Sequence, residues 1–191
     1  MERSHAPDRH HGEGAVCPPP LLRTLTSAYP AGRATFSAIL DALHDEPCNL
    51  IVTVGRDVDP TDVGPQPPHV RIERYIPQDQ ILPYCDVVVN QGGFGTITGA
   101  LRAGLPLVII PMGADQPMNA ACCEALGVGK VIGPDERTPE VIRDTVRAVL
   151  ADPAYRANAA RVGEDMAALP GLDHAVGLLE QLARDRIPIL A

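Results

Sequence analysis

Short apolar runs alternate with longer amphipathic segments through most of this 191-residue chain. Runs rich in β-branched residues suit strands, because such side chains pack well on a pleated surface. The three consecutive valines at 87–89 favour a strand buried on both faces, whereas the alternation at 70–75 indicates a strand nearer the sheet edge. We expect strands at 49–54, 70–75, 87–89 and 107–110, with a short one at 130–132.

Helical spacing fills the intervals between these strands. Phe36, Ile39 and Leu43, for example, fall on one buried stripe of a helix. Two later helices carry start signals, Thr138-Pro139-Glu140 and Asp152-Pro153, in which a capping residue precedes a proline. We expect the remaining helices at 80–84, 97–103, 116–126 and 172–183.

Strands that alternate with helices predict an α/β fold, here a single Rossmann-like, doubly wound parallel sheet with right-handed crossovers. The length suits one such domain, and we assign it residues 21–191. Residues 1–20 contain charges, histidines and a run of three prolines without an apolar face. We therefore predict that they form a disordered leader or a linker.

The composition is acidic, with a net charge of -8 and a pI of about 5.1. This balance argues against binding to nucleic acid or to anionic lipid by bulk charge. No apolar run reaches the ~18 residues that span a bilayer, and the chain does not open with a secretion signal, so we expect a cytoplasmic protein without a membrane span. The five cysteines are odd in number and match no zinc spacing, which predicts reduced thiols and no metal site.

A glycine-rich turn follows the triple-valine run. Gly92, Gly93 and Gly95 let the backbone adopt conformations that a Cβ would resist, and they let a ligand approach closely. Thr96 is expected to cap the helix at 97–103. Such a turn presents free N–H groups and the positive end of a helix, where a phosphate can bind.

A polar cluster follows the next strand. The strand at 107–110 ends at a proline, and Asp115, Gln116 and Asn119 come shortly after it. In open α/β sheets, ligands bind beyond the carboxyl ends of the strands. We therefore expect the glycine turn and this cluster to share one ligand site.

The same residues carry a family resemblance. The pattern GG-x-GT, then AL-x-x-GLPLVIIP, then DQ-x-x-NA resembles the donor-site signature of family 1 type glycosyltransferases of the GT-B fold, and is most similar to bacterial enzymes that glycosylate macrolides, enediynes and other natural products. The resemblance covers about 50–182 and corresponds to the C-terminal, donor-binding half of such an enzyme. It implies an inverting transferase whose substrate is a dTDP- or UDP-sugar, with a small-molecule acceptor and no cofactor.

The resemblance also implies roles for single residues. Thr96 would bond a phosphate oxygen, Asn119 would contact the phosphate from the facing helix, and Asp115 with Gln116 would hold hydroxyls of the transferred sugar. Carboxylate and amide groups together offer acceptors and donors to adjacent hydroxyls. Simpler interpretations remain open: Thr96 as a helix cap, Asp115 as a turn residue and Asn119 as a solvated helix position.

The turn Ile76-Pro77-Gln78 resembles the family's base-binding turn, and Tyr75 and Gln78 are the candidates to cover the base. Family members commonly carry histidine immediately before the paired glycines, where this chain has Gln91. Glutamine can donate a neutral N–H but cannot become cationic. In the family's first loop of this domain, which approaches the phosphates, Thr26-Ser27 replaces a glycine-threonine pair.

In the resembling enzymes, the acceptor pocket and the general base lie in an N-terminal domain. We therefore expect no catalytic base in this chain, and no sugar transfer by the chain alone. The expected partners are a nucleotide sugar and a separate or missing acceptor-binding domain. The alternative is a non-catalytic remnant or helper subunit, which binds a nucleotide or a protein partner and transfers no sugar.

Overall fold

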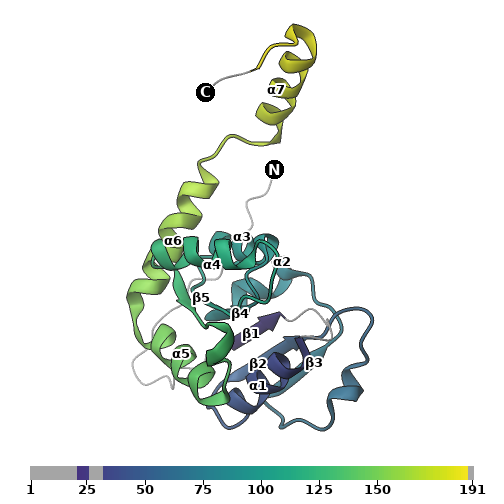
Figure 1. Ribbon diagram of the computed structural model, residues 1–191, viewed down its shortest axis with the longest axis vertical. Coiled ribbons are helices and arrows are strands. Elements are labelled where there is room, and N and C mark those ends of the chain that lie inside the picture. The colour runs from purple at the N-terminus through teal and green to yellow at the C-terminus, as the bar shows by residue number, and fades with distance from the viewer. Residues whose placement is uncertain (1–20, 26–31, 189–191) are drawn as a thin grey trace, which may run out of the picture.

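Six parallel strands form one sheet with the order β3-β2-β1-β4-β5-β6 in the computed structural model (Figure 1). The structure describes residues 21–25 and 32–188. The predicted leader at 1–20 and the pair Thr26-Ser27 lie outside the described residues. The strands are β1 (Leu21–Leu25), β2 (Asn49–Thr53), β3 (Val70–Glu73), β4 (Val87–Asn90), β5 (Leu107–Ile109) and β6 (Gly129–Val131). The expected Rossmann-like α/β fold is confirmed, and β3 is an edge strand as its alternation predicted.

Helices cover both faces of this sheet (Figure 1). The α-helices are α1 (Arg33–Leu43), α2 (Gln78–Ile81), α3 (Phe94–Arg102), α4 (Gln116–Ala125), α5 (Pro139–Ala151), α6 (Pro153–Ala167) and α7 (Leu172–Asp185). Short 3₁₀ helices are η2 (Pro60–Val63), η3 (Leu82–Tyr84) and η4 (Pro134–Glu136). The expected helix at 80–84 begins earlier, at Gln78, and continues as η3.

The sheet separates two apolar cores. Val87 and Val89 face α1 and α5, where they pack with Leu43 and Ile142. Val88 points to the opposite face, into the core formed with α3, α4 and α6. All three valines are fully buried, which explains why this strand is apolar at every position rather than at alternate ones.

Cysteines belong to both cores. Cys48 lies in the core that α1 and α5 cover, and Cys123, a residue of α4, lies in the core on the opposite face of the sheet. Burial raises the pKa of both thiols to about 11, so they stay protonated at neutral pH. The described cysteines are free thiols.

The two predicted helix starts are confirmed. The Thr138 hydroxyl accepts a hydrogen bond from Val141 N at 3.3 Å, and the Asp152 carboxylate accepts one from Ala154 N at 2.9 Å. Backbone and Thr138 hydrogen bonds in the first turn of α5 lower the pKa of Glu140. The sequence signals of a cap followed by proline therefore correspond to formed caps.

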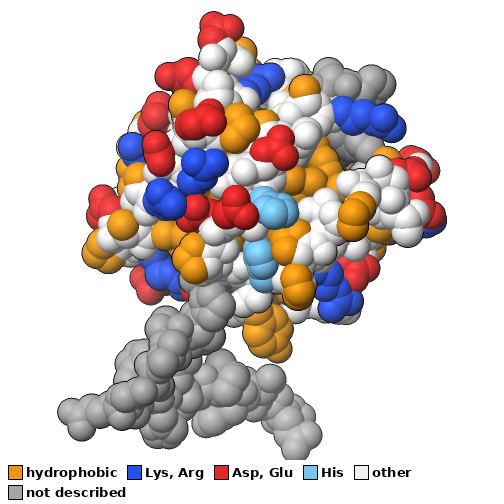
Figure 2. Space-filling view, turned by 90° about the horizontal axis from the view of Figure 1, so that it is seen from below, with side chains coloured by type: hydrophobic (Ala, Val, Ile, Leu, Met, Phe, Trp, Pro, Cys, Tyr) orange, Lys and Arg blue, Asp and Glu red, His pale blue; other side chains and the backbone are white. Residues whose placement is uncertain are grey.

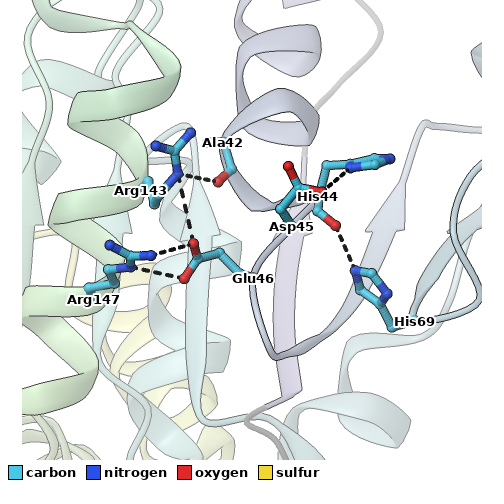
Figure 3. Close-up of polar contacts among 7 residues, drawn as sticks. All are labelled: Ala42, His44, Asp45, Glu46, His69, Arg143 and Arg147. Atoms are coloured by element: carbon cyan, nitrogen blue, oxygen red, sulfur yellow. Dashed lines mark hydrogen bonds and ion pairs between the residues drawn. The ribbon is translucent and has the colours of Figure 1, made fainter.

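An ion pair and a hydrogen bond connect α5 to α1 and to the segment between α1 and β2 (Figure 3). Arg147 donates from Nε and Nη2 to the two carboxylate oxygens of Glu46, at 2.9 and 2.7 Å. Arg143 Nε donates to the carbonyl of Ala42 at 3.0 Å. Elsewhere on the body, acidic and basic side chains are interspersed over the face seen in Figure 2.

Helix α7 extends away from the body (Figure 1). None of its residues is buried, and the predicted apolar stripe, which includes Leu172 and Leu179, is exposed. The sequence pattern predicted the helix and its stripe but not this exposure. Within 32–188, no helix is long and apolar enough to cross a membrane.

Candidate functional site

The predicted site residues gather at the carboxyl ends of β4 and β5, which are neighbours in the sheet. Ile110 N, just after β5, donates to the carbonyl of Asn90 at the end of β4, at 2.8 Å. The glycine turn after β4 and the loop after β5 therefore start side by side. This is the sheet edge where α/β folds bind ligands.

The turn after β4 is fixed by a buried hydrogen bond. Asn90 is 3% exposed, and its Oδ1 accepts from the backbone N–H of Gly92 at 2.7 Å. Gly92 is buried and has a φ of 93°, a region that L side chains rarely adopt. A Cβ there would lie 3.1 Å from both the carbonyl oxygen of Gln116 and Cγ2 of Ile109. Glycine is therefore required both by conformation and by the closeness of β5 and of the first residue of α4.

Helix α3 begins at Phe94, with Gly93 as its N-cap in an extended conformation. The carbonyl of Gly93 accepts from the N–H groups of Thr96 and Ile97, at 3.0 and 3.1 Å. The prediction that Thr96 caps the helix is wrong, because the helix starts at Phe94, three residues before the expected start, and Thr96 lies in its first turn. The N–H groups of Gly93, Phe94 and Gly95 precede the first helical hydrogen bonds, so they can bind an anion.

Thr96 contacts the first residue of α2. Its Oγ1 accepts a hydrogen bond from Gln78 Nε2 at 3.2 Å, which leaves the hydroxyl hydrogen able to donate to a ligand. Gln78 lies so close to α3 that a Cβ at Gly99 would be 2.9 Å from Gln78 Oε1. The predicted phosphate residue and one predicted base residue are therefore neighbours.

Tyr75, the other base candidate, is 56% exposed. The guanidinium carbon of Arg56 lies 4.8 Å from the centre of its ring, a cation–π arrangement. An exposed aromatic ring can stack on a planar base. Sequence reasoning did not single out Arg56, which is 19 positions away from Tyr75 in the printed sequence.

The loop after β5 brings the sugar candidates together. Gln116 Oε1 accepts from Met112 N at 2.8 Å and from Gly113 N at 3.2 Å, so its Nε2 can donate to a ligand. Asn119 Nδ2 donates to the carbonyl of Gly92 at 3.0 Å and to Asp115 Oδ2 at 2.9 Å. The exposed carboxylate of Asp115 and the amide of Gln116 thus offer an acceptor beside a donor, as a sugar diol requires.

Asn119 also joins the two halves of the site. Both hydrogens of its amide are engaged, one by the glycine turn and one by Asp115. To donate to a phosphate, as the resemblance implies, Asn119 must give up one of these bonds. In the structure described here it bridges the turn and the loop.

Gln91 stands at the position immediately before the paired glycines. Its Oε1 is buried and has no hydrogen-bond partner, and its Nε2 lies 3.5 Å from the position of a Cβ at Gly93. The carboxamide is thus packed against the turn, where it can supply a neutral donor but no positive charge.

Two residues that hold the site in place were not predicted. Asn90 could have been recognised, since a polar residue two positions before a glycine at a strand end is typical of an Asx turn. Arg137, whose Nη2 donates to the carbonyl of Pro111, gave no local signal because the two residues are 26 positions apart. No group of three or more His, Cys, Asp or Glu side chains in the described part of the chain could hold a metal ion.

A separate groove of about 470 Å³ lies between α1 and the segment after β2. Its lining is mainly apolar and includes Phe36, Leu40, Val54 and Val63. None of the predicted donor-site residues lines it.

Comparisons with known proteins agree with the fold and the motifs. Residues 37–182 match the family described as erythromycin biosynthesis protein CIII-like, C-terminal domain. The 3-alpha-mycarosylerythronolide B desosaminyl transferase of Saccharopolyspora erythraea is 35% identical over 156 residues, which cover 81% of this chain and 37% of that protein.

Solved glycosyltransferases have the same fold over this region. The calicheamicin glycosyltransferase CalG4 superposes with a TM-score of 0.78 at 28% identity, over 89% of this chain and 45% of that one. The glycosyltransferase VinC, solved in complex with DTDP, gives a TM-score of 0.77 at 27% identity, over 90% of this chain and 43% of that one. The chain thus spans less than half the length of each of these three proteins. It belongs to the erythromycin biosynthesis protein CIII-like C-terminal domain family, the C-terminal, Rossmann-like domain of natural-product glycosyltransferases of the GT-B fold.

Proposed function

We propose that this chain is the donor-binding half of an inverting glycosyltransferase, which transfers a sugar from a dTDP- or UDP-sugar to a small natural-product acceptor. The observation that carries the proposal is the arrangement at the ends of β4 and β5. There the N-terminus of α3 and the glycine turn lie directly against the loop that bears Asp115 and Gln116, joined by Asn119. A phosphate group and a sugar can therefore be bound side by side.

The glycine turn supplies the groups that a departing diphosphate needs. Without a metal, its charge must be stabilised by backbone amides, a helix end and neutral donors. The N–H groups of Gly93, Phe94 and Gly95 and the hydroxyl of Thr96 come from one turn at the start of a nine-residue helix. Gln91 adds a neutral donor beside them.

The nucleotide end of the donor follows from the position of Gln78. Its contact with Thr96 connects the segment that follows Tyr75 to the start of α3, which supports a nucleotide bound across both. Stacking of a base on Tyr75 would then put the diphosphate within reach of α3. The relative VinC was solved in complex with DTDP, which supports a pyrimidine diphosphate as the leaving group.

Transfer further requires an acceptor hydroxyl in line with the anomeric carbon and a base within about 2.6–3.2 Å of its proton. Asp115 is the carboxylate of the central cluster, and its contact with Asn119 suits it to hold the sugar. We infer that the acceptor pocket and the base come from an acceptor-binding domain, present either in a longer chain or in a separate subunit.

Calorimetry with UDP and dTDP tests the donor site. We expect binding by the chain at millimolar concentration or tighter, which corresponds to about -4 kcal/mol or better. Inorganic pyrophosphate should bind more weakly, because it lacks the base. If neither nucleotide gives heat or shifts the melting temperature at millimolar concentration, the donor site is refuted.

Reconstitution separates a transferase from a non-catalytic helper. The chain alone should transfer no sugar, and fusion or mixing with a compatible acceptor-binding half should give activity. In that assembly, Gln91→His should raise turnover, because a histidine can become cationic beside the diphosphate. Nucleotide binding with no turnover in every such assembly would favour the helper.

A further inference from the structure

The hydrogen-bond ladder between β5 and β6 stops at two prolines. Ile132 N donates to the carbonyl of Ile109 at 2.8 Å. In the same register, the next carbonyl on that side belongs to Pro111, and the next donor would be the amide of residue 134. Pro134 has no N–H, so the ladder cannot continue. The carbonyl of Pro111, a buried residue, needs a donor from elsewhere.

Arg137 supplies this donor. Arg137 directly follows η4, and its Nη2 donates to the carbonyl of Pro111. Its Nε is buried without a hydrogen-bond partner, an unfavourable arrangement that costs stability. The guanidinium of Arg137 thus supplies the hydrogen bond to the Pro111 carbonyl that Pro134 cannot make.

Pro111 begins the loop that carries the sugar candidates. Within it, Ala114 has a φ of 54°, which is uncommon for a residue with a side chain. The amides of Met112 and Gly113 are held by Gln116 alone. The bond from Arg137 is therefore a side-chain contact at the start of this loop, separate from the bridge that Asn119 makes at its end.

We propose that Arg137 is a positioning residue for the sugar end of the donor site. By holding Pro111, it sets where Asp115 and Gln116 stand opposite the glycine turn. The proposal rests on the proposed function. It assigns Arg137 an effect on the sugar rather than on the nucleotide, since Asn90 and the conformation of Gly92 hold the glycine turn without it.

The test compares Arg137→Met with wild type in calorimetry, using UDP and UDP-glucose, and dTDP and dTDP-glucose. The measured quantity is the ratio of the dissociation constants for the sugar nucleotide and the matching diphosphate. We expect the ratio to rise about tenfold in Arg137→Met, the effect of one lost or misplaced hydrogen-bond pair. Affinity for the diphosphates should change less than about twofold.

Arg143→Met is the matched control. Arg143 also donates to a backbone carbonyl, that of Ala42 (Figure 3), which lies in α1 and not at the carboxyl ends of β4 and β5. Its loss should lower stability without changing the ratio. Arg137→Lys, which keeps a cationic donor on a long side chain, should restore most of the ratio. An unchanged ratio in a folded Arg137→Met protein refutes the proposal.

Hydrogen exchange gives a readout that does not depend on nucleotide. In Arg137→Met, and in Arg137→Gln if the first variant does not fold, the amides of Met112 and Gly113 should exchange faster while that of Gly92 stays protected. Equal exchange at Met112 and Gly113 in variant and wild type refutes the positioning role. Failure of the wild-type chain to bind any nucleotide would instead refute the proposed function, and the exchange result would still decide the role of Arg137.

Discussion

The turn after β4 and the loop after β5 end neighbouring strands, yet they are held in different ways. The turn depends on one glycine and one short, buried side chain: Gly92 has a positive φ, its N–H donates to Oδ1 of Asn90, and Ile109 and Gln116 pack directly against it. The loop depends on long side chains, since Gln116 holds two of its amides and Arg137 holds its first carbonyl.

This difference suits the two expected ligands. The diphosphate is the same in all dTDP- and UDP-sugars, so a rigid turn of backbone amides can bind it without adjustment. Sugars differ in their hydroxyls, and a loop held by side chains can change with a few substitutions. We therefore expect changes in the turn to affect folding and nucleotide binding strongly. Changes in the loop should have smaller effects on stability.

The largest effect is expected for Gly92→Ala. A Cβ at this φ is strained, and it would lie 3.1 Å from Gln116 and Ile109 atoms that cannot easily move. Strain and overpacking together should lower the free energy of unfolding by about 3 kcal/mol. Urea denaturation measures this change.

Gly113→Ala is the corresponding change in the loop. No atom lies within 4 Å of a Cβ there, and φ is not in the positive range. Stability should stay within about 0.5 kcal/mol of wild type or rise slightly. Equal losses in the two variants would contradict the distinction between turn and loop.

A smaller effect is expected for Asn90→Ala, which leaves the buried N–H of Gly92 without an acceptor. This should cost about 2 kcal/mol of stability. Gln116→Ala likewise removes an acceptor, but Met112 is half-buried and Gly113 is exposed, so water can replace it. Its cost should stay below about 1 kcal/mol. Thermal and urea unfolding measure the loss of stability in each variant. A larger loss in Gln116→Ala than in Asn90→Ala would contradict the distinction between turn and loop.

Thr96→Val should leave the fold intact and weaken nucleoside diphosphate binding about tenfold, or about 1.4 kcal/mol, because it deletes one donor to a charged oxygen. The control is Thr98→Val in the same helix. The Thr98 hydroxyl bonds to the carbonyls of Phe94 and Gly95 and should not affect affinity. Calorimetry that finds wild-type affinity in Thr96→Val would mean that its hydroxyl serves only Gln78.

The order of strands and helices could be predicted because it rests on local patterns. The buried valines of β4, the caps at Thr138 and Asp152 and the spacing in α1 each signal an element through neighbouring residues. The start of α3 could not be placed in this way. Three closely spaced glycines are typical of a loop that continues. In the structure, Gly93 is extended and its carbonyl accepts two hydrogen bonds, so the helix begins at Phe94.

The site could be predicted as a set of residues but not as a network. The motifs pointed to Asp115, Gln116 and Asn119, and the structure brings them against the glycine turn. That both hydrogens of Asn119 are already engaged follows only from the packing of α4 on the turn. The support from Arg137 depends on two prolines that follow adjacent strands, a coincidence of register that no local pattern reveals.

We propose that the free amides at the start of α3 bind the diphosphate. A titration of the isotopically labelled chain with dTDP and with UDP, followed by amide chemical shifts, tests it most directly. We expect the largest shifts at Gly93, Phe94 and Gly95. No shifts at millimolar nucleotide, or shifts confined to the groove lined by Phe36 and Val63, would contradict it.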